Sequence, residues 1–363
     1  MSRFFNLAIW IAGLILSGLE DPALTGRSFD WQCRTDFSLI SDSNVLESID
    51  QPRTDQSARL MLDMQAEPRL SRNQILTLQY LGGIEGFQQY GDENRAIQHG
   101  TLLYLYKPLK SIAIGTQIQA RWRSFFQVTR GYRWSSAELF LRFYLPYGFR
   151  IKLHTSLSQI NHARASEFNY RSRNDGVMVS WSGSPRFQIF SRYLTDLRKF
   201  RSPAYALESP VPQDVVFLPK NEKHEDLHWE FAAGLEWLSW LLLRLEIGFE
   251  RQASNSYGYD FERPGLELMI VKSLPWHLVL RGYAHYQNKD YLDDLTSLVQ
   301  IHPDTETEEN RYLLFDLIRD LNQNTSIRFR VGRYQNESPL RDLYYEKTLF
   351  SFGISQSFQA SKN

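Results

Sequence analysis

The chain has 363 residues, with 41 lysines and arginines and 41 aspartates and glutamates, so its formal net charge at neutral pH is zero. This balance gives no electrostatic argument for nucleic acid as a partner. A single cysteine, Cys33, excludes an intrachain disulfide. The mean hydropathy is negative, as in soluble proteins, but membrane strands with only alternate residues facing lipid give the same average.

The first segment in chain order has the pattern of a secretory signal peptide. Arg3 supplies a positive charge, a mostly apolar run covers residues 4–16, and small residues follow. The run is short for a membrane-spanning helix, and no later stretch is long and apolar enough for one. We predict a signal peptide over residues 1–25 and one exported domain over residues 26–363. The alternative is an uncleaved anchor helix.

From about residue 29 onward, apolar and polar residues alternate with a period of two, which is typical of strands with one apolar face. Most runs last roughly ten to fourteen residues, whereas strands of globular proteins usually have ~5–6 and a tilted membrane strand needs ~9–11. Length and alternation together therefore predict membrane strands. The clearest runs cover residues 137–145, 149–157, 243–250, 276–286 and 327–333.

Short and long breaks between the runs alternate along the chain. Outer-membrane barrels have short periplasmic turns, longer outer loops and an even strand number. We therefore predict an all-β fold, a transmembrane antiparallel up-and-down barrel of about sixteen strands. The short breaks lie near residues 70–73, 107–111, 146–148, 183–185, 238–240, 272–275 and 321–324. The long ones lie near residues 42–54, 90–94, 130–133, 161–174, 200–225, 254–259, 289–309 and 335–344.

The longest predicted loop, residues 200–225, contains several prolines. It is a candidate for a constriction or lid of the channel that about sixteen strands would enclose, or for a loop that extends outward. General porins narrow the channel with a loop folded inward after an early strand. The connection after the fifth predicted strand, near residues 127–134, is too short for that. The chain is therefore not a close match to the trimeric general porins.

The last predicted strand, residues 347–358, places three phenylalanines and Ile354 on one face. It resembles the carboxy-terminal signal by which the barrel-assembly machinery recognises its clients, which ends in an aromatic residue. Here residues 359–363 follow Phe358, which departs from that pattern.

If the apolar faces point to lipid, the opposite faces line the lumen. Strands five to seven are then mainly basic inside and strands ten and eleven mainly acidic. Either these charges create a transverse field that selects solutes, or they pair across neighbouring strands and keep the lumen wettable. The basic candidates are Arg121, Arg123, Arg142, Arg150, Lys152, Arg281, Arg328 and Arg330. The acidic candidates are Asp36, Asp63, Glu67, Glu138, Glu230, Glu236, Glu246, Glu250 and Asp316.

His154 and Ser156 have the His-x-Ser spacing of outer-membrane phospholipase A, in which such a pair activates a hydroxyl nucleophile. In that family the pair faces lipid and the barrel has fewer strands. Here the apolar residues Ile151, Leu153 and Leu157 claim the lipid face, which turns His154 and Ser156 inward. We therefore predict that they line the lumen and that the protein is not an enzyme.

We expect no cofactor and no metal site, because the sequence has no ligand spacing typical of zinc or calcium and no glycine-rich phosphate loop. Tyr104, Tyr144 and Tyr283 are expected to face inward, where they are candidate sugar contacts. The tryptophans on the predicted lipid face indicate interface girdles rather than sugar platforms. These are Trp122, Trp181, Trp229, Trp237 and Trp276.

The first strand and loop contain Asp42-Ser43-Asn44-Val45. An opening strand followed by this motif resembles the outer-membrane β-barrel porin family often found beside exopolysaccharide and other envelope genes. The resemblance implies an envelope porin linked to polysaccharide export and carries over no catalytic residue. Asp42 and Asn44 most simply serve as turn residues.

Together, these features predict a passive channel in the outer membrane of a Gram-negative bacterium, for small polar solutes or saccharides. One alternative is a non-conducting barrel, plugged by its loops, that serves polysaccharide export, assembly or adhesion. The others are a phospholipase-like hydrolase and, at the level of fold class, a soluble β protein. The expected partners are outer-membrane lipids and lipopolysaccharide, with the barrel-assembly machinery and periplasmic chaperones during biogenesis. Oligomerisation is left open.

Overall fold

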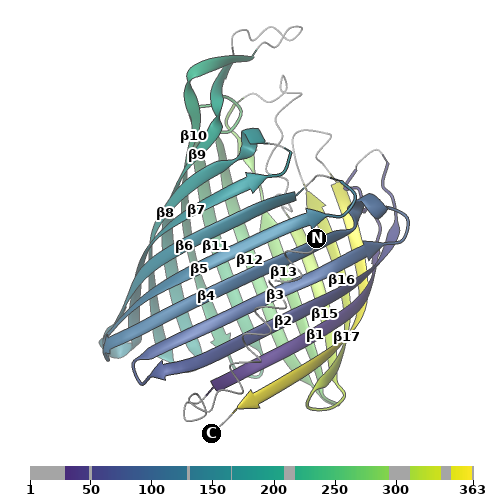
Figure 1. The fold of residues 1–363 in the computed structure, drawn as a ribbon. Coiled ribbons are helices and arrows are strands. Elements are labelled where there is room, and N and C mark those ends of the chain that lie inside the picture. Colours follow the sequence, from purple (N-terminus) through teal and green to yellow (C-terminus); the bar gives the residue numbers. More distant parts are fainter. Residues whose placement is uncertain are drawn as a thin grey trace.

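The computed structural model describes residues 29–48, 51–128, 131–164, 166–207, 217–293, 311–336 and 345–361. Within these ranges the chain forms one antiparallel sheet that closes on itself (Figure 1). No described helix is long and apolar enough to cross a membrane. The predicted signal peptide lies outside the described residues and stays a prediction.

The barrel wall consists of sixteen long strands, as predicted from the alternation. A further two-residue strand, β14 (Asp290–Tyr291), pairs with the loop end of β12. Short 3-10 turns lie at η1 (Gly91–Glu93), η2 (Pro146–Gly148) and η3 (Ser166–Phe168). The long strands are β1 (Phe29–Asp42), β2 (Asp55–Ser71), β3 (Gln74–Phe87), β4 (Arg95–Leu109), β5 (Ile112–Phe125), β6 (Gly131–Tyr144), β7 (Phe149–His162), β8 (Tyr170–Ser184), β9 (Phe187–Leu207), β10 (Phe217–Leu238), β11 (Leu242–Ser254), β12 (Phe261–Leu274), β13 (Leu278–Gln287), β15 (Arg311–Asp320), β16 (Thr325–Asn336) and β17 (Tyr345–Ser361).

The first and last strands close the barrel. Each long strand pairs with the next one along the chain, and β1 also pairs with β17 from Asp30 opposite Ser361 to Asp42 opposite Leu349. Closure satisfies the backbone hydrogen bonds of both terminal strands, which an open sheet edge in lipid could not do. The seven short turns follow β2, β4, β6, β8, β10, β12 and β15, where the sequence predicts them.

One tryptophan lies elsewhere than predicted. Trp276 is in the turn between β12 and β13, with its neighbour His277, and both have positive φ angles. It is therefore not a residue of the strand face, although it is strongly exposed at the turn end of the barrel.

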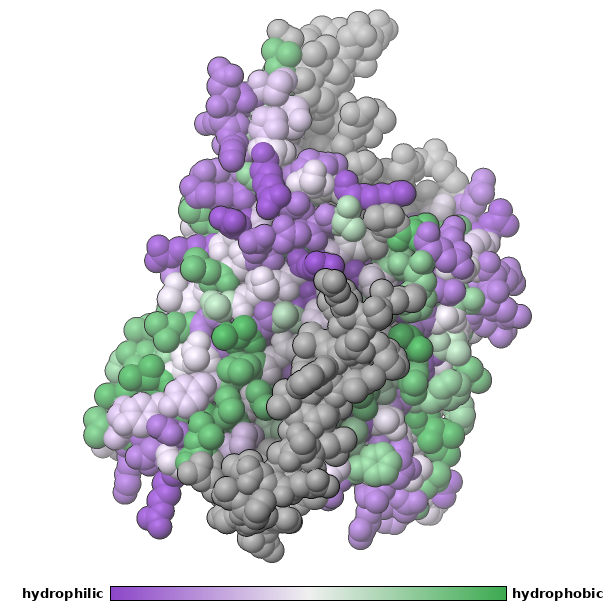
Figure 2. Space-filling model, in the orientation of Figure 1, coloured by the Kyte–Doolittle hydropathy of each residue, from purple (hydrophilic) through white to green (hydrophobic). Residues whose placement is uncertain are grey.

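The outer face of the wall is apolar. Residues directly opposite each other on paired strands share a face, so Phe37 of β1 shares its face with Leu60 of β2 and Ile354 of β17. All three side chains are exposed, and apolar side chains gather over the barrel wall in Figure 2 while hydrophilic ones gather at its loop end. A closed barrel with this exterior spans a membrane, and the bacterial outer membrane is where such barrels reside.

The region of residues 200–225 was wrongly predicted to be a loop. β9 continues to Leu207 and β10 begins at Phe217, so most of this stretch is a β-hairpin, with residues 208–216 outside the described ranges. The hairpin rises above the barrel in Figure 1. It therefore extends away from the lumen, and its described part does not form an inward-folded constriction. The loop predicted near residues 161–174 is also shorter, because β8 begins at Tyr170.

Candidate functional site

The inner face of β10–β12, which we call the acidic wall, carries Glu230, Glu236, Glu246 and Glu250. Arg192 of β9 joins two of these carboxylates. Its guanidinium lies 2.6 Å from Glu230 and 2.7 Å from Glu246, and Arg244 adds a second contact to Glu246 at 3.2 Å. Because Glu246 is only 5% exposed, this pairing compensates a carboxylate that is largely removed from water.

The loop end of the acidic wall is also paired. Glu250 contacts His228 at 3.0 Å and accepts a hydrogen bond from Arg263 of β12. Glu236, near the turn end, is exposed and has no ion pair among the described residues. Arg192, Arg244 and Arg263, three arginines that the sequence reasoning missed, therefore neutralise Glu230, Glu246 and Glu250. Glu267, which also faces inward on β12, contacts His285 at 3.2 Å.

The inner face of β5–β7, which we call the basic wall, carries five cations. They are Arg121, Arg123, Arg142, Arg150 and Lys152. Strand direction places Arg121 and Arg123 toward the loop end of β5, and the other three near the turn end of β6 and β7. Cations therefore face the lumen near both ends of this wall.

Lys152 of the basic wall forms an ion pair with Glu138 at 2.6 Å. Arg150 donates hydrogen bonds to the neutral side chains of Ser182 (2.7 Å) and Gln188 (3.1 Å). No carboxylate among the described residues pairs with this arginine.

Arg121 and Arg142 also lack a carboxylate partner within the described part of the chain. Arg142 stacks instead over the ring of Phe140, 4.6 Å from its centroid, and Arg123 stacks over Phe125 at 5.0 Å. Arg121, Arg142 and Arg150 thus face the lumen without a carboxylate partner among the described residues.

A third group of charges spans the seam between the ends of the chain. Arg330 of β16 holds Asp316 of β15 through two hydrogen bonds of 2.6 and 2.8 Å. Asp36 of β1 contacts Arg328 at 2.9 Å and Arg34 at 2.8 Å. This group therefore forms local ion pairs like those of the acidic wall.

The remaining candidates lie beside this group. Asp63 lies directly opposite Arg34, and Arg281 directly opposite Asp316, both on the inner face. Glu67 accepts a 2.8 Å hydrogen bond from Gln65. Among the described residues, Asp63, Arg281 and Glu67 form no ion pair within 4 Å.

An apolar cluster interrupts the polar inner face near the turn end of β3–β6. Leu105, Ala113 and Phe140 are buried there, with Tyr144 packed against them. Arg142 and Lys152 both lie over the ring of Phe140, at 4.6 and 4.9 Å from its centroid. The stacking orients these two cations along the wall.

The comparisons with known proteins establish the fold. No protein-family model matches the chain, and no curated protein sequence matches it. OprB of Pseudomonas putida has a similar structure, with a TM-score of 0.55 and 9% sequence identity, over 91% of this chain and 94% of that chain. This is the fold of an outer-membrane β-barrel.

Two further solved structures have lower scores. OccAB3 of Acinetobacter baumannii gives a TM-score of 0.47 at 7% identity, over 92% of this chain and 99% of that chain. OccK5 of Pseudomonas aeruginosa gives 0.46 at 8% identity, over 92% and 98%. At such identities the likeness concerns the fold, and the function has to be argued from the residues of this barrel.

One predicted inward tyrosine faces the other way. Tyr104 of β4 lies opposite Leu76 and Thr116, on the outer face, so the prediction that it lines the lumen is wrong. Tyr144 and Tyr283 are on the inner face, where their role as sugar contacts stays a prediction. The tryptophans at positions 122, 181, 229 and 237 are on the outer face of the barrel.

The His-x-Ser pair of β7 faces the lumen. His154 Nε2 lies 3.1 Å from Asn174 Oδ1 on β8, and no hydrogen bond joins His154 to Ser156 among the described residues. A serine nucleophile needs that hydrogen bond to lose its proton. The structure therefore lacks the contact on which the hydrolase alternative depends. No described group of three or more histidine, cysteine or acidic side chains could hold a metal ion.

The Asp42-Ser43-Asn44-Val45 motif ties the β1–β2 loop to β17. Asn44 is 2% exposed, accepts a hydrogen bond from the Ser48 amide, and donates to the carbonyls of Ser48 and Glu346 at 2.8 and 3.1 Å. The backbone amide of Asn44 donates a 2.8 Å hydrogen bond to the Asp42 carboxylate. The backbone amide of Ser43 donates to the Thr348 carbonyl, and the Ser43 hydroxyl accepts from the Thr348 amide. The motif is a turn whose side chains also fasten the barrel seam.

Proposed function

We propose that the protein is a passive outer-membrane channel for small polar solutes or saccharides, with a preference for anionic ones. The observation that carries the preference is the unequal pairing of the two walls. Arg121, Arg142 and Arg150 face the lumen without carboxylate partners among the described residues, whereas most carboxylates of the acidic wall are held by arginines. Unpaired charges raise the local concentration of counter-ions in a pore.

The positions of the cations support passage rather than tight binding. An anion entering from the loop end first meets Arg121 and Arg123, and one leaving toward the turn end meets Arg142 and Arg150. Conduction requires several weak sites, because a single strong site would retain the solute. The stacking of Arg142 on Phe140 keeps its charge fixed beside the path.

Single-channel recording in a planar bilayer tests the proposal. The full chain is refolded and checked for the heat-modifiable mobility of a closed barrel, and the reversal potential is read under a salt gradient. We expect steady open conductance and a reversal potential that indicates anion selectivity. This selectivity should weaken as the ionic strength rises, because salt screens the wall charges. A folded barrel without conductance would reject the channel, and cation selectivity would reject the assigned role of the basic wall.

The projecting β9–β10 hairpin favours a second candidate, a non-conducting envelope component that acts in assembly or adhesion. This hairpin extends beyond the barrel rim, where a macromolecular partner can reach it. A silent, folded barrel whose hairpin is protected from protease in cells and cleaved in the purified protein would support this second function.

A further inference from the structure

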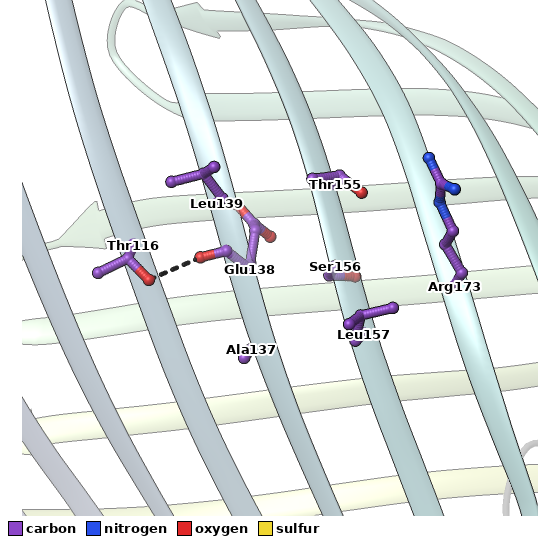
Figure 3. Close-up of a pocket in the computed structure, with 8 residues that line it drawn as sticks. All are labelled: Thr116, Ala137, Glu138, Leu139, Thr155, Ser156, Leu157 and Arg173. Carbon is purple, nitrogen blue, oxygen red and sulfur yellow. Dashed lines mark hydrogen bonds between the residues drawn. The ribbon is translucent and has the colours of Figure 1, made fainter.

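A groove of about 370 Å³ lies on the outer face of β5–β8 (Figure 3). Leu139 and Leu157 are 57% and 65% exposed and stand on its two sides. The smaller residues Ala137 and Thr155 lie between them, opposite Leu157 and Leu139 respectively in the strand register. An apolar groove on this face of a membrane barrel is open to the acyl chains of the bilayer.

Arg173 borders the groove and carries a charge onto the lipid side of the barrel. Its Nε lies 2.9 Å from Asp175, and the two side chains are 64% and 43% exposed. They are the fourth and sixth residues of β8 from its loop end. A charge on the lipid face costs several kcal/mol at the membrane centre and little near the interface, so this pair belongs at the level of the lipid headgroups.

Two more cations lie beside this ion pair on the same face. Arg171 is directly opposite Lys199 of β9, and like charges in this position repel each other. Lys199 contacts Glu225 at 2.9 Å, and Arg173 contacts Asp175. No carboxylate in the described part of the chain pairs with Arg171, which is exposed. One positive charge in this group is therefore uncompensated.

The opposite part of the outer wall also carries an ion pair near its loop end, where Arg333 of β16 lies 2.9 Å from Glu346 of β17. On β15–β17, Phe315, Phe329 and Phe352 alternate outward with other apolar residues across the middle of the strands. On β5–β9 the ion pair adjoins an apolar groove and an arginine, Arg171, that pairs with no carboxylate among the described residues. An arginine is well suited to bind a phosphate through two parallel hydrogen bonds.

We propose that this part of the outer wall binds a phosphate-bearing lipid of the outer leaflet. One acyl chain lies in the groove between Leu139 and Leu157, and the phosphate contacts Arg171 and Arg173. Charge complementarity selects the headgroup, and the apolar groove adds affinity that free phosphate would lack. The site is independent of conduction through the lumen.

Native mass spectrometry of the refolded full chain in detergent tests the site. The probes are lipid A, the phosphorylated lipid of lipopolysaccharide, and lipid A from which the phosphates have been removed. We expect the barrel to retain lipid A and to bind the phosphate-free form at least tenfold more weakly. R171Q should weaken lipid A binding to a similar extent. A137F fills the groove and should weaken the binding of both lipids.

Two controls keep the result specific. R173Q/D175N removes the ion pair without changing net charge and should retain part of the affinity through Arg171. R319Q removes an exposed outward arginine at the turn end of β15 and should bind lipid A like the unchanged chain. Equal binding of the two lipids, or equal losses in R171Q and R319Q, would overturn the proposal. A lipid-free dimer that A137F abolishes would instead assign the groove to a second copy of the chain.

Discussion

The basic and acidic walls of the lumen are built from the same kind of strand but differ in how many of their charges form ion pairs. On the acidic wall, Glu230, Glu246 and Glu250 contact arginines of the same or neighbouring strands. On the basic wall, Glu138 is the one carboxylate among five cations, and Lys152 contacts it. The number of charges on a lumen face therefore does not set its electrostatic field. What remains after pairing across strands does, and on the basic wall it is positive.

Removing Arg192, which contacts two carboxylates of the acidic wall, should have the greatest consequence for stability. In R192M, Glu230 loses its partner and the buried Glu246 keeps only Arg244. An unpaired buried charge is costly, so we expect the free energy of unfolding to fall by about 3 kcal/mol. Urea unfolding in detergent, followed by tryptophan fluorescence, measures this. Adding E230Q and E246Q to R192M should restore most of the loss, and a loss without such recovery would contradict the assigned pairing.

A smaller effect is expected at the rim above the acidic wall. Burial, followed by the negative charge of Asp226, raises the pKa of Tyr259 in the β11–β12 loop to about 12. Because the folded pKa exceeds the usual value of about 10, the stability that the protonated phenol contributes is complete below pH 10. This contribution is lost as the pH rises from 10 to 12.

The Y259F variant removes only the hydroxyl and keeps the aromatic ring, whose centroid lies 4.5 Å from that of the His224 ring. We expect the unchanged protein to lose about 1 kcal/mol more than Y259F between pH 9 and pH 11. Urea unfolding at the two pH values gives the difference. An equal fall in the free energy of unfolding of both proteins would contradict the raised pKa of the Tyr259 phenol.

Neutralising arginines of the basic wall should change ion selectivity only modestly. R121Q/R142Q removes two unpaired charges, and each is worth about 1 kcal/mol or less to an ion in water. We expect the anion preference in the reversal potential to fall by roughly two- to fivefold. R121K/R142K should retain it. E236Q, which removes an exposed carboxylate of the acidic wall, should raise it slightly, and a larger change in E236Q than in R121Q/R142Q would reverse the comparison.

The fold could be predicted because the membrane imposes a period of two on every spanning strand. That constraint placed the seven short turns and the strand number correctly. It weakens where both faces of a strand are apolar, as in β4, in which Leu102 faces out and Leu103 and Leu105 face in. The side of Tyr104 could not be derived from such a run. Beyond the rim, the β9–β10 hairpin has no lipid-facing side, and its strands were mistaken for a loop.

Which charged side chains form ion pairs was harder to predict than which residues face the lumen. Arg244 could have been assigned to the inner face from the same alternation that assigned Glu246. The contact of Arg192 with Glu230 spans 38 residues of sequence, and it depends on a register that the sequence does not specify. Which lumen charges pair with one another could therefore not be derived from the sequence.

The hydrogen bonds of Asn44 set an order on the folding of the barrel. Asn44 reaches the Glu346 carbonyl across 302 residues of sequence, so this contact has nearly the largest loop-closure cost in the chain. Until β17 arrives, a buried amide has lost water without gaining its partner. Closure of the barrel between β1 and β17 therefore requires the carboxy-terminal strand. The barrel completes its circumference only when β17 pairs with β1, and the contact of Asn44 with Glu346 forms together with that pairing.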